Sequence, residues 1–129
     1  MGLQYVTGVQ HLGLPARDPG KTAAFYEQLG FVPVLHTRVP ATQEEVFFLQ
    51  LGGILLEVYG TAEWAGRDGA IDHIALNVTD IQRTWEQVKA LGMTPLEPSI
   101  QELPFWERGV RYFNIYGINH EKIEFCQIL

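Results

Sequence analysis

The sequence predicts an α+β fold built from two modules, each containing one strand, one helix and then three strands. The first observation behind this prediction is an internal repeat, and the second is that helix start and stop signals recur at equivalent places in both copies. A single spacing of 62 residues aligns the following pairs without a gap: His11 with His73, Asp18 with Asp80, Leu29 with Leu91, and Gly30 with Gly92. We expect one domain over residues 1–129, with module one at about 6–60 and module two at about 70–129.

Each copy carries one predicted helix. Asp18 followed by Pro19 is typical of an N-cap with proline at the first helical position, and Gly30 is typical of a left-handed stop. The first helix is therefore expected from about Pro19 to Leu29. Asp80 caps the second helix, in which apolar residues recur at steps of three and four. The expected buried stripe consists of Ile81, Trp85, Val88 and Leu91.

The remaining segments alternate in hydropathy, as strands do. The strands expected in module one cover residues 6–14, 32–39, 46–51 and 54–59. Pro33 favours an edge position for the second of these strands, and Gly52-Gly53 predicts a two-residue hairpin turn. In module two we expect a strand from His73, an irregular crossing rich in proline, and a closing hairpin of residues 110–115 and 122–128.

Composition excludes several classes of function. Nine basic and fifteen acidic side chains give a formal charge of -6, which repels nucleic acids and anionic membranes. Cys126 is the lone cysteine, so no internal disulfide can form. No segment reads as a signal peptide or a membrane span, and we expect a soluble, cytoplasmic protein.

Four side chains point to a metal site. His11 and His73 are equivalent in the repeat, and Glu57 and Glu124 both lie within final strands whose neighbouring residues are apolar. Strand alternation directs all four away from the helices, and two imidazoles with two carboxylates suit a divalent transition metal. The alternatives are a hydrogen-bonded structural histidine and a glutamate that reaches solvent, but charged groups on an inner face are costly unless paired or metal-bound.

The chain resembles the vicinal oxygen chelate superfamily, which includes glyoxalase I, bleomycin and fosfomycin resistance proteins and extradiol dioxygenases. The resemblance rests on H-L-G-L at His11, F-Y-E-Q-L-G-F ending at Phe31, L-L-E-V-Y around Glu57, D-H-I-A-L-N-V-T-D at His73 and H-E-K-I-E-F around Glu124. It implies paired βαβββ modules whose curved mixed sheets enclose a metal-binding cavity, with His11, Glu57, His73 and Glu124 as ligands. It also implies a homodimer, in which half-sites from two chains combine in many relatives.

The ligand set is most similar to that of glyoxalase I. That enzyme typically carries an arginine four residues after its first histidine and an asparagine four residues after its first glutamate, both serving glutathione. This chain has Pro15 and Thr61 at those places. We therefore expect a small oxygen-rich substrate that is not linked to glutathione.

The expected chemistry is that of a metal-dependent lyase or isomerase. A divalent ion, either Ni, Co, Zn, Mn or Fe, would stabilise the enediolate formed when a proton next to a carbonyl is removed. By resemblance, Glu124 is the first candidate for the base, and Glu57 serves as ligand or as base for the opposite face. The alternatives are a binding or resistance protein that uses the same cavity, and a metal-dependent dioxygenase.

Four further residues are candidates for contacting substrate. They are Asn77, Gln50, Trp106 and Arg111. Asn77 shares the strand face of His73, and a structural hydrogen bond is an equally good interpretation for it and for Gln50. Trp106 and Arg111 lie in or just after the loop that borders the pocket in relatives, with aromatic packing and a solvated arginine as the alternatives.

Overall fold

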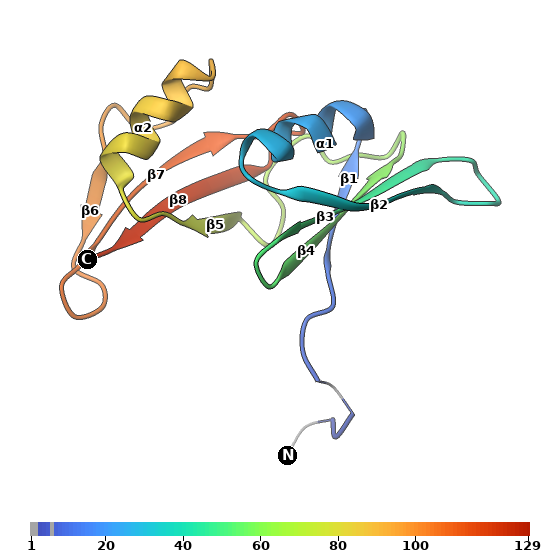
Figure 1. Cartoon of the computed structure of the whole chain (residues 1–129), viewed down its shortest axis with the longest axis horizontal. Coiled ribbons are helices and arrows are strands. Elements are labelled where there is room, and N and C mark those ends of the chain that lie inside the picture. Colours follow the sequence, from blue (N-terminus) through green and yellow to red (C-terminus); the bar gives the residue numbers. More distant parts are fainter. Residues whose placement is uncertain (1–2, 6) are drawn as a thin grey trace. The chain divides into compact units, whose positions relative to one another are not determined.

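The computed structural model describes residues 3–5 and 7–129, and the chain divides into two compact units at Trp64 and Ala65. Each unit has its own four-stranded mixed sheet and its own helix (Figure 1). The predicted α+β class, with two modules of one strand, one helix and three strands, is confirmed.

The first unit is built on a sheet of strand order β1-β4-β3-β2. Its elements are β1 (Leu12–Ala16), α1 (Pro19–Gln28), β2 (Val32–Arg38), β3 (Glu45–Leu51) and β4 (Ile54–Gly60). Strand β1 runs parallel to β4, and the other neighbours are antiparallel. Helix α1 packs on one face of this sheet, where Tyr26, Leu49 and Leu56 are almost completely buried. The opposite face carries Glu57 together with Phe48, Leu55 and Tyr59.

The second unit repeats this plan with the order β5-β8-β7-β6. Its elements are β5 (His73–Asn77), α2 (Ile81–Ala90), β6 (Gln101–Leu103), β7 (Val110–Tyr116) and β8 (Lys122–Ile128). Strand β5 runs parallel to β8, and α2 packs on β7 and β8. Phe113 and Ile123 are completely buried in this core, and the Trp85 ring meets the Phe113 ring edge-on at 5.1 Å.

Both helices begin and end where the sequence predicts. The side chains of Asp18 and Asp80 each accept a hydrogen bond, at 3.0 Å, from the backbone N–H three residues on. Gly30 and Gly92 follow the helices at φ of 104° and 84°, which side-chain-bearing residues rarely adopt. Of the predicted stripe in α2, Ile81 and Val88 are buried and Trp85 half-buried, whereas Leu91 is 51% exposed because it lies at the C-cap.

Two strand predictions need correction. The first strand begins at Leu12 rather than in residues 6–11, so His11 precedes the strand, and Val6 lies outside the described residues. Leu12 pairs with Leu56, and β4 begins only two residues before Leu56, so earlier residues have little partner strand. Strand β6 lies within what the sequence suggests is an irregular crossing, because three residues are too short to show a pattern.

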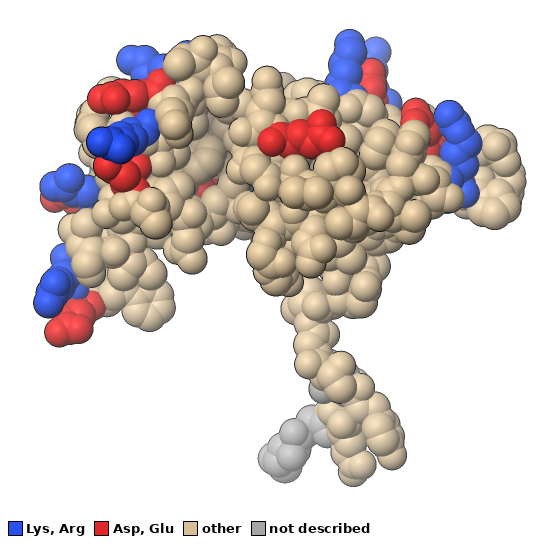
Figure 2. Space-filling model, viewed as in Figure 1, with Lys and Arg blue, Asp and Glu red and all other residues tan. Residues whose placement is uncertain are grey.

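Strand β2 is the edge of its sheet, as Pro33 predicts, and the register with β3 shifts between Pro33 and Leu35. On the face shown in Figure 2, basic and acidic side chains are interspersed around both units rather than segregated by sign. Within the described residues, neither ten-residue helix is long and apolar enough to cross a membrane.

Candidate functional site

The first unit brings His11 and Glu57 together. Glu57 lies in the middle of β4, and its neighbour on β1 is Gly13, two residues after His11. The Nε2 atom of His11 lies 3.7 Å from Oε1 of Glu57. Both side chains are partly exposed, so this pair remains accessible from solvent.

The ring of His11 is oriented by its neighbours. Its Nδ1 donates to the side-chain oxygen of Gln10, and its edge meets the Phe48 ring at a centroid distance of 5.7 Å. Phe48 is the β3 neighbour of Glu57. With Nδ1 engaged, Nε2 is the nitrogen that faces Glu57, and it is the ring nitrogen that a metal could bind.

The second unit repeats the pair at equivalent backbone positions. His73 opens β5, and Glu124 on β8 is the neighbour of Ala75, just as Glu57 is the neighbour of Gly13. Nδ1 of His73 donates to the carboxylate of Asp72 at 2.9 Å. Asp72 occupies the position of Gln10 in the repeat, so in both units the preceding residue engages Nδ1. The hydrogen bond from His73, and then that from Lys122, lower the pKa of Asp72.

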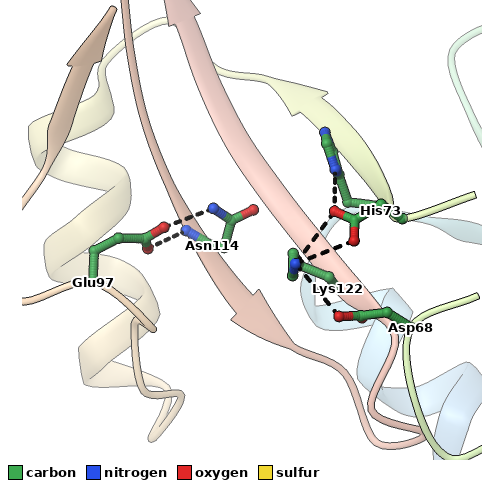
Figure 3. A network of polar contacts seen from close by, with 6 residues as sticks. Asp68, His73, Glu97, Asn114 and Lys122 are labelled. Atoms are coloured by element: carbon green, nitrogen blue, oxygen red, sulfur yellow. Dashed lines mark hydrogen bonds and ion pairs between the residues drawn. The ribbon is translucent and has the colours of Figure 1, made fainter.

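Asp72 is itself held by Lys122, which also pairs with Asp68 (Figure 3). Nζ of Lys122 lies 3.2 Å from Asp72 and 3.4 Å from Asp68. The hydrogen bond with Asp72 is the main cause of the raised pKa of Lys122. The second carboxylate oxygen of Asp68 is buried without a hydrogen-bond partner in the described structure. The positive charge of Lys122 is therefore matched by two carboxylates.

A cleft of about 560 Å³ lies over the face of the second sheet that carries His73 and Glu124. Its lining consists of Asp72, His73, Ala75, Leu103, Phe105, Trp106, Val110, Tyr112, Asn114, Lys122, Glu124, Cys126 and Ile128. Burial raises the pKa of Glu124, and the nearby carboxylate of Glu97 adds to this effect while His73 opposes it. Burial also raises the pKa of the Cys126 thiol, which favours its protonated form.

Asn114 is the β7 neighbour of Glu124 and is fixed by Glu97 (Figure 3). The backbone N–H and the side-chain Nδ2 of Asn114 each donate to the Glu97 carboxylate at 2.7 Å. Strand β6 pairs with β7 only as far as Tyr112, so Glu97 satisfies an N–H that lacks a strand partner. The side-chain oxygen of Asn114 is left as an acceptor beside Glu124.

Of the four residues predicted to contact substrate, one lines the cleft and three lie outside its lining. Trp106 lines the cleft at 73% exposure, whereas Asn77 is exposed at the far end of β5 and outside the lining. Gln50 lies on the Glu57 face of the first sheet, with Nε2 3.4 Å from the Gly52 carbonyl. Arg111 lies on the other face of β7, where its Nε pairs with Glu102 at 3.0 Å. Arg111 does not line the cleft. Side chains alternate along β7, so Tyr112 lies on the same face as Asn114, and Arg111 lies on the opposite face.

Several residues of the cleft were not anticipated from the sequence. Asp72 and Lys122 could have been found from their positions next to His73 in the repeat and two residues before Glu124. The alternation of the predicted strand at 110–115 already separates Tyr112 and Asn114 from Arg111. Glu97, which fixes Asn114 but does not line the cleft, had no such signal, because it lies in an irregular segment and its contact with Asn114 spans 17 residues.

The four predicted ligands are divided between the units as two His–Glu pairs. Among residues 3–5 and 7–129, no three His, Cys, Asp or Glu side chains are grouped so that they could hold a metal ion. The chemistry of each pair nevertheless fits a divalent transition metal, since each supplies one imidazole nitrogen with its partner nitrogen engaged and one carboxylate.

Comparisons with known proteins agree with this architecture. The family model described as the glyoxalase/bleomycin resistance protein/dioxygenase superfamily matches residues 8–102. A search of curated proteins gives no match.

Solved structures share the fold. A glyoxalase family protein from Enterococcus faecalis superimposes with a TM-score of 0.78 at 20% identity, covering 95% of this chain and 99% of its own. The fosfomycin resistance protein FosX from Listeria monocytogenes, in complex with Mn(II) and sulfate, gives 0.74 at 17% identity, covering 96% and 94%. A glyoxalase family protein from Bacillus anthracis gives 0.72 at 16% identity, covering 99% and 100%. At these identities the likeness concerns the fold alone.

Proposed function

Because the chain belongs to the glyoxalase/bleomycin resistance protein/dioxygenase superfamily, we propose that it is a metal-dependent lyase or isomerase of the glyoxalase I-like type. It removes a proton next to a carbonyl of a small, oxygen-rich substrate that is not linked to glutathione. The superfamily contains enzymes of several reaction classes, so the reaction type rests on the site itself.

One observation carries the proposal, namely the repetition of an oriented His–Glu pair. His11 with Glu57 and His73 with Glu124 stand at equivalent sheet positions, with Nδ1 of each histidine engaged by the preceding side chain. A solvated histidine has no need of such an arrangement, whereas a metal ligand requires a fixed ring orientation and tautomer.

The metal would be held by His11, Glu57, His73 and Glu124, with the two pairs combined either within one chain or across a homodimer. We propose one divalent ion per complete site, drawn from Ni, Co, Zn, Mn or Fe. The Mn(II) bound to FosX supports a divalent ion in this fold. When bound, such an ion supplies Lewis acidity toward the carbonyl oxygen of the substrate.

The residues of the chain supply the remaining chemistry. Glu124, partly buried and next to the Asn114 amide, is the base that takes the proton from the carbon beside the carbonyl. Glu57 serves as ligand or as the base on the opposite face. Trp106 contacts the body of the substrate, and Asn77 and Gln50 are polar contacts at the margins of the two sheets. Arg111, paired with Glu102, has no part in this proposal.

The surroundings of Thr61 support a substrate without glutathione. Its backbone N–H donates to the Ala16 carbonyl at 3.1 Å, and its hydroxyl accepts from the Glu63 N–H at 3.1 Å. Both of these hydrogen bonds of Thr61 are made within the protein, where the chain leaves β4. Pro15 offers no side-chain donor at the other glutathione position.

The decisive experiment combines metal content with proton exchange. We expect about one metal per four-ligand set by elemental analysis, and its loss in each of the variants His11→Ala, Glu57→Ala, His73→Ala and Glu124→Ala. His36→Ala is the matched control, because His36 pairs with Glu45 on the surface and should keep the metal. The metal-loaded protein should also incorporate deuterium next to the carbonyl of an α-hydroxycarbonyl compound in D₂O. A folded protein that takes up none of the five metals contradicts the proposal.

A binding or resistance protein is the second candidate. The apolar wall of the cleft supports it, since Phe105, Trp106 and Tyr112 can hold a small molecule without chemistry. Ligand binding unaffected by a chelator, with no deuterium incorporation, would favour this function. Oxygen uptake with a catechol would favour a dioxygenase instead.

A further inference from the structure

The cleft of the second unit carries a specific pattern of charge and apolar surface. Six of its lining side chains form an apolar wall: Leu103, Phe105, Trp106, Val110, Tyr112 and Ile128. Phe105 and Trp106 are 55% and 73% exposed, so this wall has free aromatic surface at its rim. A flat apolar group can bury area against it, and aromatic pairs add to that stabilisation.

The cleft offers no free cation to an anionic group. Within residues 65–129, all of which the structure describes, Lys122 is the one Lys or Arg side chain of the lining. Its ammonium group is already bound by Asp72 and Asp68. An anionic ligand would therefore meet the Glu124 carboxylate and a Lys122 ammonium group whose charge is already balanced by Asp72 and Asp68.

The cleft places two hydrogen-bond acceptors next to each other, on Asn114 and on Glu124. Nδ2 of Asn114 is used by Glu97, so its oxygen faces the cleft beside the Glu124 carboxylate. Such a site hydrogen-bonds a hydroxyl group well and strongly disfavours a molecule that lacks the donor.

The corresponding sheet face of the first unit has the same character. Strands β1, β3 and β4 contain no Lys or Arg, and the face of Glu57 carries Leu55, Phe48 and Tyr59. Both surfaces that bear predicted metal ligands are thus apolar and acidic.

We infer that the site takes an uncharged substrate with a flat, preferably aromatic body and a hydroxyl group next to its carbonyl, and that it discriminates against carboxylates and phosphonates. The position of that carbonyl rests on the proposed function, whereas the charge selection rests on the cleft alone. This assigns Asn114 to the hydroxyl group and Trp106 to the flat body.

The inference is tested by two phenyl compounds of similar size that differ in charge. 2-Hydroxyacetophenone, C6H5COCH2OH, is neutral, and mandelate, C6H5CH(OH)COO⁻, is an anion with a hydroxyl group next to its carboxylate. We expect the metal-free, ¹⁵N-labelled protein to bind 2-hydroxyacetophenone at least about tenfold more tightly, a difference of about 1.4 kcal/mol, with saturable shifts at the Trp106 indole N–H. Equal or tighter binding of mandelate overturns the inference, and so does the absence of binding by either compound.

Hydroxyacetone, which lacks the ring, separates the two parts of the site. Trp106→Ala should weaken 2-hydroxyacetophenone by about tenfold and leave hydroxyacetone unchanged, whereas Asn114→Leu should weaken both. Trp64→Ala, outside the cleft, is the matched control and should change neither. Loss of both ligands in Trp106→Ala, with the control intact, contradicts the role given to the ring.

Failure of the inference and failure of the proposed function give different results. Preference for the neutral compound without metal-dependent deuterium incorporation overturns the enzyme proposal and leaves the charge selection standing. Deuterium incorporation together with a preference for mandelate overturns the charge selection and leaves the enzyme proposal standing.

Discussion

The His11–Glu57 pair and the His73–Glu124 pair occupy the same backbone positions in two copies of one unit, yet their surroundings differ. In the first unit, the histidine is hydrogen-bonded to the neutral amide of Gln10 and contacts the aromatic ring of Phe48. In the second, the corresponding histidine is held by an aspartate that is itself held by Lys122. The position of Phe48 is taken by Asn114, whose neighbour Glu97 comes from an irregular segment.

This difference separates two tasks that share one scaffold. The elements common to both units, namely the histidine, the glutamate and an acceptor for Nδ1, are those that a metal requires. The elements found in the second unit, namely the Lys122 network, the Asn114 amide and the aromatic wall, are those that would select and orient a substrate. In the proposed function, the shared elements would hold the metal, and the elements found in the second unit would give specificity for the substrate.

Removing a buried ring from the core of the second unit should cause the largest loss in the free energy of unfolding. Phe113→Ala removes a completely buried ring that contacts both Trp85 and Phe125, and should cost about 3–5 kcal/mol in the free energy of unfolding. Urea denaturation followed by circular dichroism measures this loss. Phe105→Ala, at a half-exposed position of the cleft wall, is the control and should stay within about 0.5 kcal/mol. A cost below 1 kcal/mol for Phe113→Ala would contradict its place in the core.

Replacing the residue that orients each histidine tests the comparison directly. Asp72→Ala should lower the affinity for a divalent metal by about 10–100-fold, because His73 loses a charged partner for Nδ1. Gln10→Ala should lower it less, since a neutral amide contributes a weaker hydrogen bond. Isothermal titration with Zn²⁺ measures both.

The control for this test is Asp72→Asn, which keeps an acceptor oxygen and removes the charge, so its affinity should lie between the wild type and Asp72→Ala. Lys122 retains Asp68 as a partner in either variant. An equal or greater loss in Gln10→Ala would show that the anionic network gives the second half-site no advantage.

The smallest effects should come from the helix caps, where the two units are alike. Asp18→Ala and Asp80→Ala each remove an acceptor for the backbone N–H three residues on, and each should cost about 0.5–2 kcal/mol. Thermal denaturation should give equal losses for the two variants, and the asparagine variants should recover most of the stability. A large difference between the two would mean that one cap has a further role.

The regularities of the repeat made most of the fold predictable. The caps, the glycine stops and the Gly52-Gly53 turn each have a local physical cause, so α1, α2 and the hairpins could be placed from sequence. Strand alternation likewise separated Glu57 and Glu124 from the buried Leu56, Ile123 and Phe125 around them.

The features that could not be predicted from the sequence depend on contacts between distant segments. The late start of β1 follows from the length of its partner strand, and β6 is too short to carry a pattern. Glu97 meets Asn114 only because β6 ends early and leaves an N–H unpaired. The four ligands themselves remain a prediction, since their assembly depends on how two pairs combine.

The edge strand β2 has a consequence for how this protein meets other molecules. An exposed edge offers unpaired backbone groups on which a foreign strand can add, and Val32 and Leu35 are more than half exposed there. Pro33 has no N–H to offer, and the register shift that follows it interrupts the regular spacing of donors and acceptors. Both features make the β2 edge a poor template for strand addition, so they disfavour aggregation by that route.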